Sequence, residues 1–210
     1  MAATQVKNVI FDLGGVLVDW NPRYLYRKLF KDEREMETFL RDVCNSEWNE
    51  QQDAGRPFKE AIELILKDHP EKEPYVRAYF DRWAEMLGGP IHGTVEILEE
   101  LHRWKSHRLL ALSNWSAETF PIAKRAYSFL GLFETVLLSG EEKLIKPDPR
   151  FFNLLKTRLG AEPEQSVFID DVQKNIDAAR ALGFHTIHFK GPEKLRADLR
   201  ERFGITLDEK

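Results

Sequence analysis

Short runs of consecutive apolar residues recur along the chain, and between them apolar residues return at helical spacing. Consecutive rather than alternating apolar residues are typical of strands buried on both faces of a parallel sheet. Strands that alternate with helices of about ten to fourteen residues need parallel crossovers. The pattern therefore predicts an α/β fold with a Rossmann-like, doubly wound parallel sheet. Strands are expected at residues 7–12, 108–112, 135–138, 166–169 and 185–189, and helices at 94–105, 117–130, 148–159, 173–182 and 193–203.

Residues 24–88 differ from the rest of the chain because they show helical spacing but no convincing strand. Breaks at Asp53–Pro57 and at His69–Pro70 divide this block. Just before it, Val16–Val18 is expected to form a short apolar hairpin arm. A purely helical block inserted after the first strand predicts a separate cap domain. The expected division is a helical cap at 19–89 and a sheet domain formed by 1–18 and 90–210.

The composition is that of a soluble globular protein, with 42% apolar and 31% charged residues in a chain of 210 residues. The net charge of −4 and the lack of a basic stripe argue against nucleic acid as a partner. A single cysteine, Cys44, excludes an intramolecular disulfide framework and fits a reducing compartment. The sequence shows neither a secretory signal pattern nor an apolar run of about 18 residues. We therefore expect a cytoplasmic protein without a membrane partner, and the pattern indicates no particular oligomeric state.

Polar side chains follow four of the predicted strands, and the carboxyl ends of parallel strands meet at one edge of a sheet. Asp12 ends the first strand, and Gly14 and Gly15 after it let backbone or ligand approach closely. One crevice should therefore collect the polar residues of all four strand ends. Those after the other strands are Ser113, Asn114, Lys146, Asp170 and Asp171.

Three converging carboxylates would repel one another unless a cation lay between them. Oxygen ligands without cysteine or histidine favour a hard ion, and Mg²⁺ is typically bound by one or two carboxylates together with a substrate phosphate. The Ser113 hydroxyl and the Lys146 ammonium supply the donors and the positive charge that a phosphoryl group requires. The strand ends therefore predict a Mg²⁺ site that binds a phosphoryl group.

Four segments resemble, in order, the four motifs of the haloacid dehalogenase (HAD) superfamily: Phe11–Val16, Leu112–Asn114, Lys146–Pro149 and Ile169–Asp171. The helical insertion between the first and second motifs resembles the branch with a small helical cap. That branch holds many sugar-phosphate and other small-metabolite phosphatases. The resemblance extends over about residues 7–190, and it implies a HAD-like core with a helical cap and phosphatase activity.

Carried over residue by residue, the resemblance implies that Asp12 is the nucleophile. It would take the phosphoryl group as an aspartyl-phosphate, which water then hydrolyses. Lys146 would neutralise charge between Asp12 and the transferring group, and Ser113 would bind the phosphoryl oxygens. The resemblance also implies a Mg²⁺ site formed by Asp12, the backbone carbonyl of Gly14, Asp170 and Asp171.

Contacts to the rest of the substrate are expected from two places. Trp48 and Arg56 belong to a polar and aromatic cluster around a helix break in the cap block, where a sugar would find hydroxyl partners and a ring face. Asn114 and Trp115 follow Ser113 directly, at the edge of the predicted site. We expect these four residues to bind substrate.

The sequence departs from the family pattern at Gly14. Most family phosphatases carry there a second Asp, which protonates the leaving group and then activates water; such help is worth about 10²–10⁴ in rate. Phosphatase activity survives this loss if the leaving group is a good one, such as an anomeric sugar phosphate. It also survives if Asp19 or a water takes over the role.

Two alternatives stay open. A 2-haloacid dehalogenase uses the same aspartate against carbon and needs no acid at position 14. That activity does not account for Asp170 and Asp171, whose negative charge would repel a haloacid carboxylate. The other alternative is a non-catalytic protein that binds a phosphorylated ligand or a protein partner.

Overall fold

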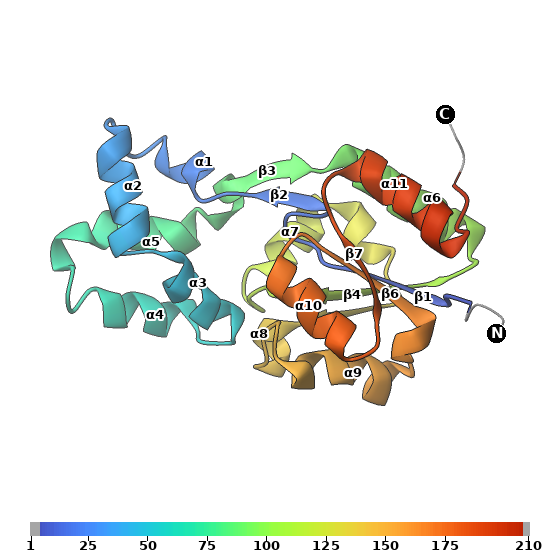
Figure 1. The fold of residues 1–210 in the computed structure, drawn as a ribbon. Helices are drawn as coiled ribbons and strands as arrows, with labels where there is room; N and C mark the ends of the chain where they lie inside the picture. The colour runs from blue at the N-terminus through green and yellow to red at the C-terminus, as the bar shows by residue number, and fades with distance from the viewer. Residues whose placement is uncertain (1–4, 208–210) are drawn as a thin grey trace.

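Residues 5–207 are described by a computed structural model whose centre is a five-stranded parallel sheet (Figure 1). The order across the sheet is β5-β4-β1-β6-β7, and every neighbouring pair is parallel. All five predicted strands are confirmed to within two residues at each end. They are β1 Asn8–Phe11, β4 Arg108–Ser113, β5 Thr135–Leu138, β6 Ser166–Asp170 and β7 His185–His188.

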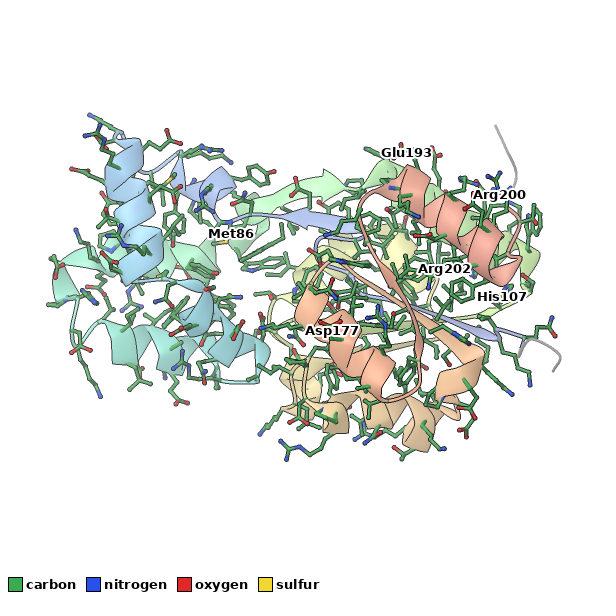
Figure 2. All side chains as sticks on the ribbon, in the orientation of Figure 1. Met86, His107, Asp177, Glu193, Arg200 and Arg202 are labelled. Atoms are coloured by element: carbon green, nitrogen blue, oxygen red, sulfur yellow. The ribbon has the colours of Figure 1, made fainter. Side chains whose placement is uncertain are left out.

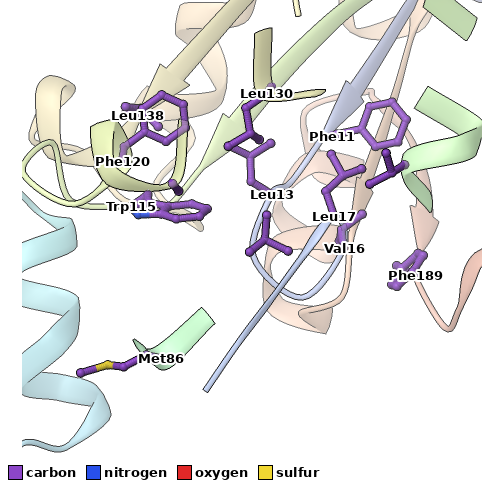
Figure 3. Packing of buried hydrophobic residues seen from close by; sticks show 14 of the residues in the cluster. Phe11, Leu13, Val16, Leu17, Met86, Trp115, Phe120, Leu130, Leu138 and Phe189 are labelled. Carbon is purple, nitrogen blue, oxygen red and sulfur yellow. The ribbon is translucent and has the colours of Figure 1, made fainter. Parts of the chain in front are cut away.

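Alternate residues of the strands pack on opposite sides of the sheet, as the two-residue period of a strand requires. Ile10, Leu110 and Phe168 belong to one buried cluster with α9 and α10. Their neighbours Val9, Phe11 and Ile169 belong to the larger cluster with α6 and α11. These two helices lie side by side (Figure 1), and Phe11 is seen among the buried side chains of the cluster in Figure 3. The helices are α6 His92–Trp104, α9 Pro149–Leu159, α10 Gln173–Ala181 and α11 Pro192–Phe203.

The remaining helical segments of the sheet part are short. The helix expected at 117–130 is interrupted, because Tyr127 adopts an extended conformation with φ −127° and ψ 101°. A further short helix follows β5 where no helix was predicted. These segments are α7 Phe120–Ala126, α8 Ser139–Glu142 and the 3₁₀ turns η3 Ser128–Gly131 and η4 Pro163–Gln165.

A second, two-stranded sheet joins the helical block to the sheet part (Figure 1). The predicted hairpin arm at Val16–Val18 is wrong in its pairing: β2, Val18–Trp20, pairs antiparallel with the distant β3, Leu87–Pro90. The sequence pattern does not predict β3, because two of its residues are glycines and glycine is depleted in strands. Gly88 is required there, since a Cβ atom would overlap the carboxylate of Asp19.

The block between β2 and β3 is helical, as predicted, and stands to one side of the main sheet (Figure 1). Its interior is aromatic: the Phe30 and Tyr75 rings stack 4.3 Å apart, and Trp48 meets Tyr79 edge-on at 4.9 Å. Met86, fully buried, lies at its junction with β3 (Figure 2). The elements are α1 Arg23–Tyr26, α2 Glu33–Asp42, α3 Ser46–Asp53, α4 Phe58–Ile65, η1 Pro70–Lys72, α5 Glu73–Asp81 and η2 Trp83–Met86.

Within residues 5–207, every helix is too short or too polar to cross a membrane.

Candidate active site

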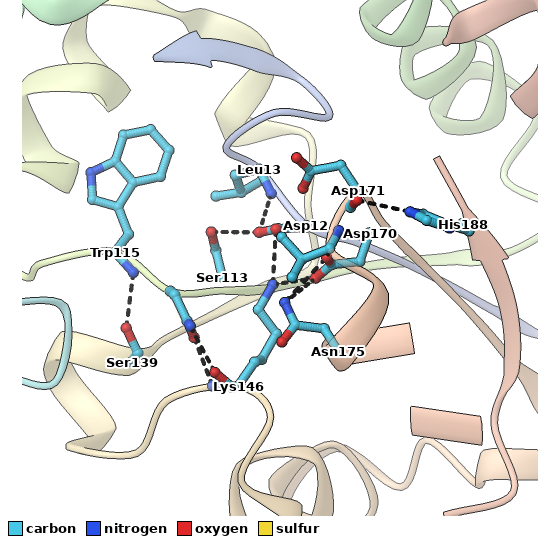
Figure 4. Close-up of polar contacts among 12 residues, drawn as sticks. Asp12, Leu13, Ser113, Trp115, Ser139, Lys146, Asp170, Asp171, Asn175 and His188 are labelled. Carbon is cyan, nitrogen blue, oxygen red and sulfur yellow. Dashed lines mark hydrogen bonds and ion pairs between the residues drawn. The ribbon is translucent and has the colours of Figure 1, made fainter. Parts of the chain in front are cut away.

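The carboxyl edge of the sheet gathers polar side chains from three strands and one loop (Figure 4). Asp12 follows β1, Ser113 ends β4 and Asp170 ends β6. Lys146 comes from the loop between α8 and α9. All four side chains are at least nine-tenths buried, so their charges and hydrogen bonds act with little screening by water.

Both carboxylate oxygens of Asp12 have partners. Oδ1 accepts hydrogen bonds from the Leu13 amide at 2.7 Å and from the Ser113 hydroxyl at 2.8 Å. Oδ2 lies 3.0 Å from Nζ of Lys146. Burial raises the pKa of Asp12 above its usual range, and Lys146 opposes that effect. The carboxylate is thus fixed in orientation at the floor of the site.

Lys146 bridges two carboxylates, since its Nζ also lies 2.7 Å from Asp170 Oδ2. Burial lowers the pKa of Lys146, but Asp12 and Asp170 more than offset this, and the pKa lies above its ordinary value. Asn114 holds the Lys146 backbone from both sides: its amide nitrogen donates to the Lys146 carbonyl at 3.0 Å, and its oxygen accepts from the Lys146 amide at 2.8 Å. The ammonium group is therefore charged and held in place.

Asp170 is fully buried and accepts further hydrogen bonds from the Val172 amide at 2.7 Å and from Asn175 Nδ2 at 3.0 Å. Asn175 Oδ1 is buried without a hydrogen-bond partner. Asp171 lies directly beside Gly15, whose φ is +73°. A Cβ atom at Gly15 would lie 2.5 Å from Asp171 Oδ2, so both the backbone angle and the close approach require glycine.

The acidic residues fit a divalent cation. Asp12, Asp170 and Asp171 each offer one carboxylate oxygen, and these oxygens all lie within 4.8 Å of one another. Burial, and next the charge of Asp170, raise the pKa of Asp171, as expected for acidic groups whose charge is not fully neutralised. Lys146 supplies one positive charge against three carboxylates. An all-oxygen donor set with excess negative charge suits a hard ion such as Mg²⁺.

A cavity of about 330 Å³ lies above these groups and is closed on the far side by the helical block. Asp12, Gly14, Lys146 and Asp171 line its floor. Its apolar wall consists of side chains from both parts of the chain, Trp20, Phe58, Trp83 and Trp115. Its polar wall consists of Asn49, Glu50 and Asp53 from α3, Asn114 and Thr119 from the sheet part, and Lys174 and Asn175 from α10.

Four predicted substrate-binding residues have different surroundings. Trp115 lines the cavity and donates from its indole nitrogen to Thr119 Oγ1 at 3.1 Å. Asn114 lines it too, but its amide is already bonded to the Lys146 backbone. Trp48 and Arg56 do not belong to the cavity lining: Trp48 packs against Phe58 and Tyr79, and Arg56 donates to Gln52.

The helical block instead reaches the cavity through Asn49, Glu50 and Asp53. Positions 49 and 53 are four residues apart and share one face of α3, whereas 48 and 52 fall on a neighbouring face, and Arg56 lies beyond the end of the helix. The sequence thus indicated the polar cluster at the end of α3, whereas the residues of this cluster that line the cavity are Asn49 and Asp53 rather than Trp48 and Arg56. Asn45, which caps α3 by accepting from the Trp48 amide at 2.8 Å, is the signal that fixes where this helix begins.

The chain is similar to known proteins over most of its length. Residues 6–183 match the sequence model of the haloacid dehalogenase-like hydrolases. A sesquiterpene phosphatase from Aspergillus oryzae is 26% identical, over 96% of this chain and 98% of its own length. A phosphorylated carbohydrates phosphatase from Thermotoga maritima is 26% identical, over 86% of this chain and 83% of its own length. A shorter match of 84 residues, 39% identical, spans 38% of this chain and only 8% of the mouse acyl-CoA dehydrogenase family member 10.

Solved structures share the fold over nearly the whole chain. A predicted HAD-like family hydrolase from Porphyromonas gingivalis superposes with a TM-score of 0.73, at 25% identity, over 94% of this chain and 99% of that one. A HAD family enzyme from Bacteroides thetaiotaomicron, solved with magnesium and inorganic phosphate, has a TM-score of 0.67 at 24% identity, over 89% of this chain and 95% of that one.

Proposed function

Since the chain belongs to the haloacid dehalogenase-like hydrolase family, we propose that it is a Mg²⁺-dependent phosphatase that hydrolyses a small phosphorylated metabolite through an aspartyl-phosphate. The observation that carries the proposal is the buried Asp12 carboxylate. It lies at the floor of a cavity, between a hydroxyl and an ammonium donor and beside two further carboxylates.

In the proposed reaction an Asp12 oxygen attacks phosphorus, and the bond from phosphorus to the leaving oxygen breaks. The leaving oxygen takes up a proton and the metabolite departs. Water then attacks the phosphorus of the aspartyl-phosphate, releasing inorganic phosphate and restoring Asp12. Lys146 and Ser113, which already contact the two Asp12 oxygens, would compensate the charge on the transferring phosphoryl group.

Asp12, Asp170 and Asp171 would hold Mg²⁺, together with the Gly14 backbone carbonyl. When bound, the ion supplies positive charge to the phosphoryl oxygens. Asn175 donates to Asp170 at 3.0 Å and so orients one of the ligand carboxylates from behind, as supporting residues in metal sites commonly do.

The cavity favours a phosphorylated carbohydrate as substrate. The α3 residues Asn49, Glu50 and Asp53 offer hydrogen-bonding partners for hydroxyl groups, and Trp20, Trp83 and Trp115 offer apolar surface for a ring face. The relatives named as acting on phosphorylated carbohydrates and on sesquiterpenes show that the family accommodates both polar and apolar leaving groups. The three polar groups on the cap wall support a carbohydrate, and the cavity volume of about 330 Å³ supports a small metabolite as the partner.

The second candidate is a 2-haloacid dehalogenase, which Gly14 favours. A solved L-2-haloacid dehalogenase has the same fold, with a TM-score of 0.58 at 20% identity, so the fold alone does not separate the two activities. Asp170 and Asp171 do separate them, because two carboxylates beside Asp12 would repel a haloacid carboxylate unless a cation intervened.

Phosphate release from a panel of sugar phosphates, nucleotides and an aryl phosphate, with Mg²⁺ or with EDTA, tests the proposal. Chloride release from a 2-haloacid is measured alongside. We expect Mg²⁺-dependent phosphate release that Asp12→Asn abolishes. Asp19→Asn is the matched control, because Asp19 lies outside the cavity lining and accepts from the Tyr24 hydroxyl at 2.6 Å. Metal-independent chloride release would establish the dehalogenase instead.

A further inference from the structure

The proposed reaction needs a proton donor for the leaving group, and the position two residues after the nucleophile cannot supply one. Gly14 has no side chain, and a Cβ atom placed there would meet nothing within 4 Å. Asp19 is not part of the cavity lining and already accepts a hydrogen bond from Tyr24. Within residues 5–207, the carboxyl groups that line the cavity are those of Asp12, Glu50, Asp53 and Asp171.

Two of these four belong to the floor of the site, as nucleophile and as metal ligand, which leaves Glu50 and Asp53 on the cap wall. Glu50 is half-exposed, and its carboxylate lies 3.6 Å from the ammonium group of Lys174. Asp53 has no ion-pair partner within the described residues. It is therefore the carboxyl group that can hold a proton inside the cavity.

Resting on the proposed phosphatase function, we propose that Asp53 of the helical cap is the general acid and base of the reaction, acting on the leaving-group oxygen and then on water.

A chain of hydrogen bonds fixes Asp53 in orientation. The hydroxyl of Tyr79, which is 1% exposed, donates to Asn49 Oδ1 at 2.9 Å, and Asn49 Nδ2 donates to Asp53 Oδ2 at 2.9 Å. The Ser139 hydroxyl donates to the Asp53 carbonyl at 2.6 Å, so the sheet part holds the end of α3 directly. Asp53 is thus presented to the cavity by a fixed helix rather than by a free loop.

The surroundings of Asp53 favour transfer of a proton near neutral pH. Burial raises the pKa of Asp53 to about 7, and a backbone hydrogen bond from Ser116 opposes the rise. Glu50 on the same helix raises it further, and Asn49 lowers it. Tyr79 faces Asp53 from α5, while the charged groups across the cavity are Lys174 and those of the floor. An acid with a pKa near the working pH can both donate and accept.

The proton balance closes without a further reactant. As the bond from phosphorus to the leaving oxygen breaks, the electron pair stays on that oxygen, which takes the Asp53 proton. When water attacks the aspartyl-phosphate, its proton passes to ionised Asp53, and the second proton stays with the released phosphate. Asp53 is then protonated again for the next turnover.

Asp53→Asn is tested on two substrates of similar shape, phenyl phosphate and 4-nitrophenyl phosphate. Phenol, with a pKa of about 10, leaves poorly without a proton, whereas 4-nitrophenolate is a much better leaving group. We expect the variant to lose about 10²-fold in kcat/KM on phenyl phosphate. The loss on 4-nitrophenyl phosphate should be at least about tenfold smaller. For the wild type, kcat/KM on phenyl phosphate should fall as the pH rises through about 7. This fall should be absent in Asp53→Asn.

Two further variants separate chemistry from folding. Glu50→Gln removes the neighbouring cavity carboxylate and should change kcat/KM by the same factor on both substrates. Adding Gly14→Asp to Asp53→Asn should restore part of the phenyl phosphate activity, because the space at position 14 is open. Equal losses on both substrates in Asp53→Asn, or no loss, would overturn the role of Asp53. If the wild type shows no turnover, or if turnover persists in Asp12→Asn, the proposed function is overturned and this inference with it.

Discussion

Lys146 balances the charge of the site, because its ammonium group lies within 3.0 Å of both Asp12 and Asp170 and is 1% exposed. Removing one partner of a buried ion pair leaves uncompensated charge, which costs about 3–5 kcal/mol. We expect Lys146→Met to lower the free energy of unfolding by about that amount in the absence of metal, and to abolish turnover. Urea unfolding monitored by circular dichroism measures the first effect.

Lys156→Met is the control for this substitution. Lys156 pairs with Glu162 at 2.8 Å, but its side chain is 55% exposed, so the loss should stay below about 1 kcal/mol. Equal destabilisation by the two substitutions would show that Lys146 does not compensate buried charge.

Asp53 should make stability depend on pH in a definite direction. Its folded-state pKa is raised from 3.8 to about 7, so between these values the folded chain binds a proton that the unfolded chain has released. The contribution of Asp53 is therefore fully present below about pH 4 and is lost as the pH rises to about 7. Relative to Asp53→Asn, the wild type should lose about 3 kcal/mol between pH 4.5 and pH 8. Urea titrations at both values measure this, and a constant difference would contradict the raised pKa.

Single residues of the floor were predictable because each stands where an apolar run ends. Asp12, Ser113 and Asp170 follow or end buried strands, and a parallel sheet brings such ends together. The cap contribution was harder to predict, because choosing between Trp48 and Asn49 requires knowing how α3 is rotated. The packing of Trp48 against Phe58 and Tyr79 determines that rotation. The sequence of α3 alone does not predict these contacts.

At the scale of elements, strands with consecutive apolar residues were found at their observed places, whereas β3 was missed. Its four residues include two glycines and a proline, so it lacks the side chains that mark a strand. The pairing of β3 with β2 is long-range and could not be inferred from Val16–Val18 alone. We infer that these two strands bound a cap domain at residues 19–89.

The end of α3 is attached to the sheet part by Ser139, a fully buried residue at the start of α8. Its hydroxyl donates to the Asp53 carbonyl and accepts from the Trp115 amide at 2.9 Å. Ser139→Ala removes both bonds and leaves two backbone groups unsatisfied. It should cost about 1–3 kcal/mol of stability. Because Asp53 is held less firmly, it should also lower kcat/KM more on phenyl phosphate than on 4-nitrophenyl phosphate.

Thermal unfolding and the same two-substrate comparison measure these effects. Ser106→Ala, on the exposed turn after α6, should change stability by less than about 0.5 kcal/mol. A Ser139→Ala enzyme that keeps wild-type kcat/KM on both substrates would show that this contact does not position Asp53.

At the scale of the whole molecule, the sheet part provides the proposed nucleophile and the acidic cluster, and the helical block lines the opposite side of the cavity. The chain order of strands and helices was sufficient to predict this architecture, because parallel strands need crossover helices and the insertion between β2 and β3 shows only helical spacing. The identity of the substrate depends on the shape of a cavity formed jointly by both parts, which no single segment encodes.

The most direct test of the account is to find where the phosphoryl group resides during turnover. Wild-type protein is mixed with 4-nitrophenyl phosphate and Mg²⁺, quenched in acid within one turnover, digested and analysed by mass spectrometry. The account predicts a mass increase of one phosphoryl group on the peptide that contains Asp12, lost with EDTA and in Asp12→Asn. Steady release of phosphate with no such adduct, or with the adduct on another residue, would contradict Asp12 as the nucleophile.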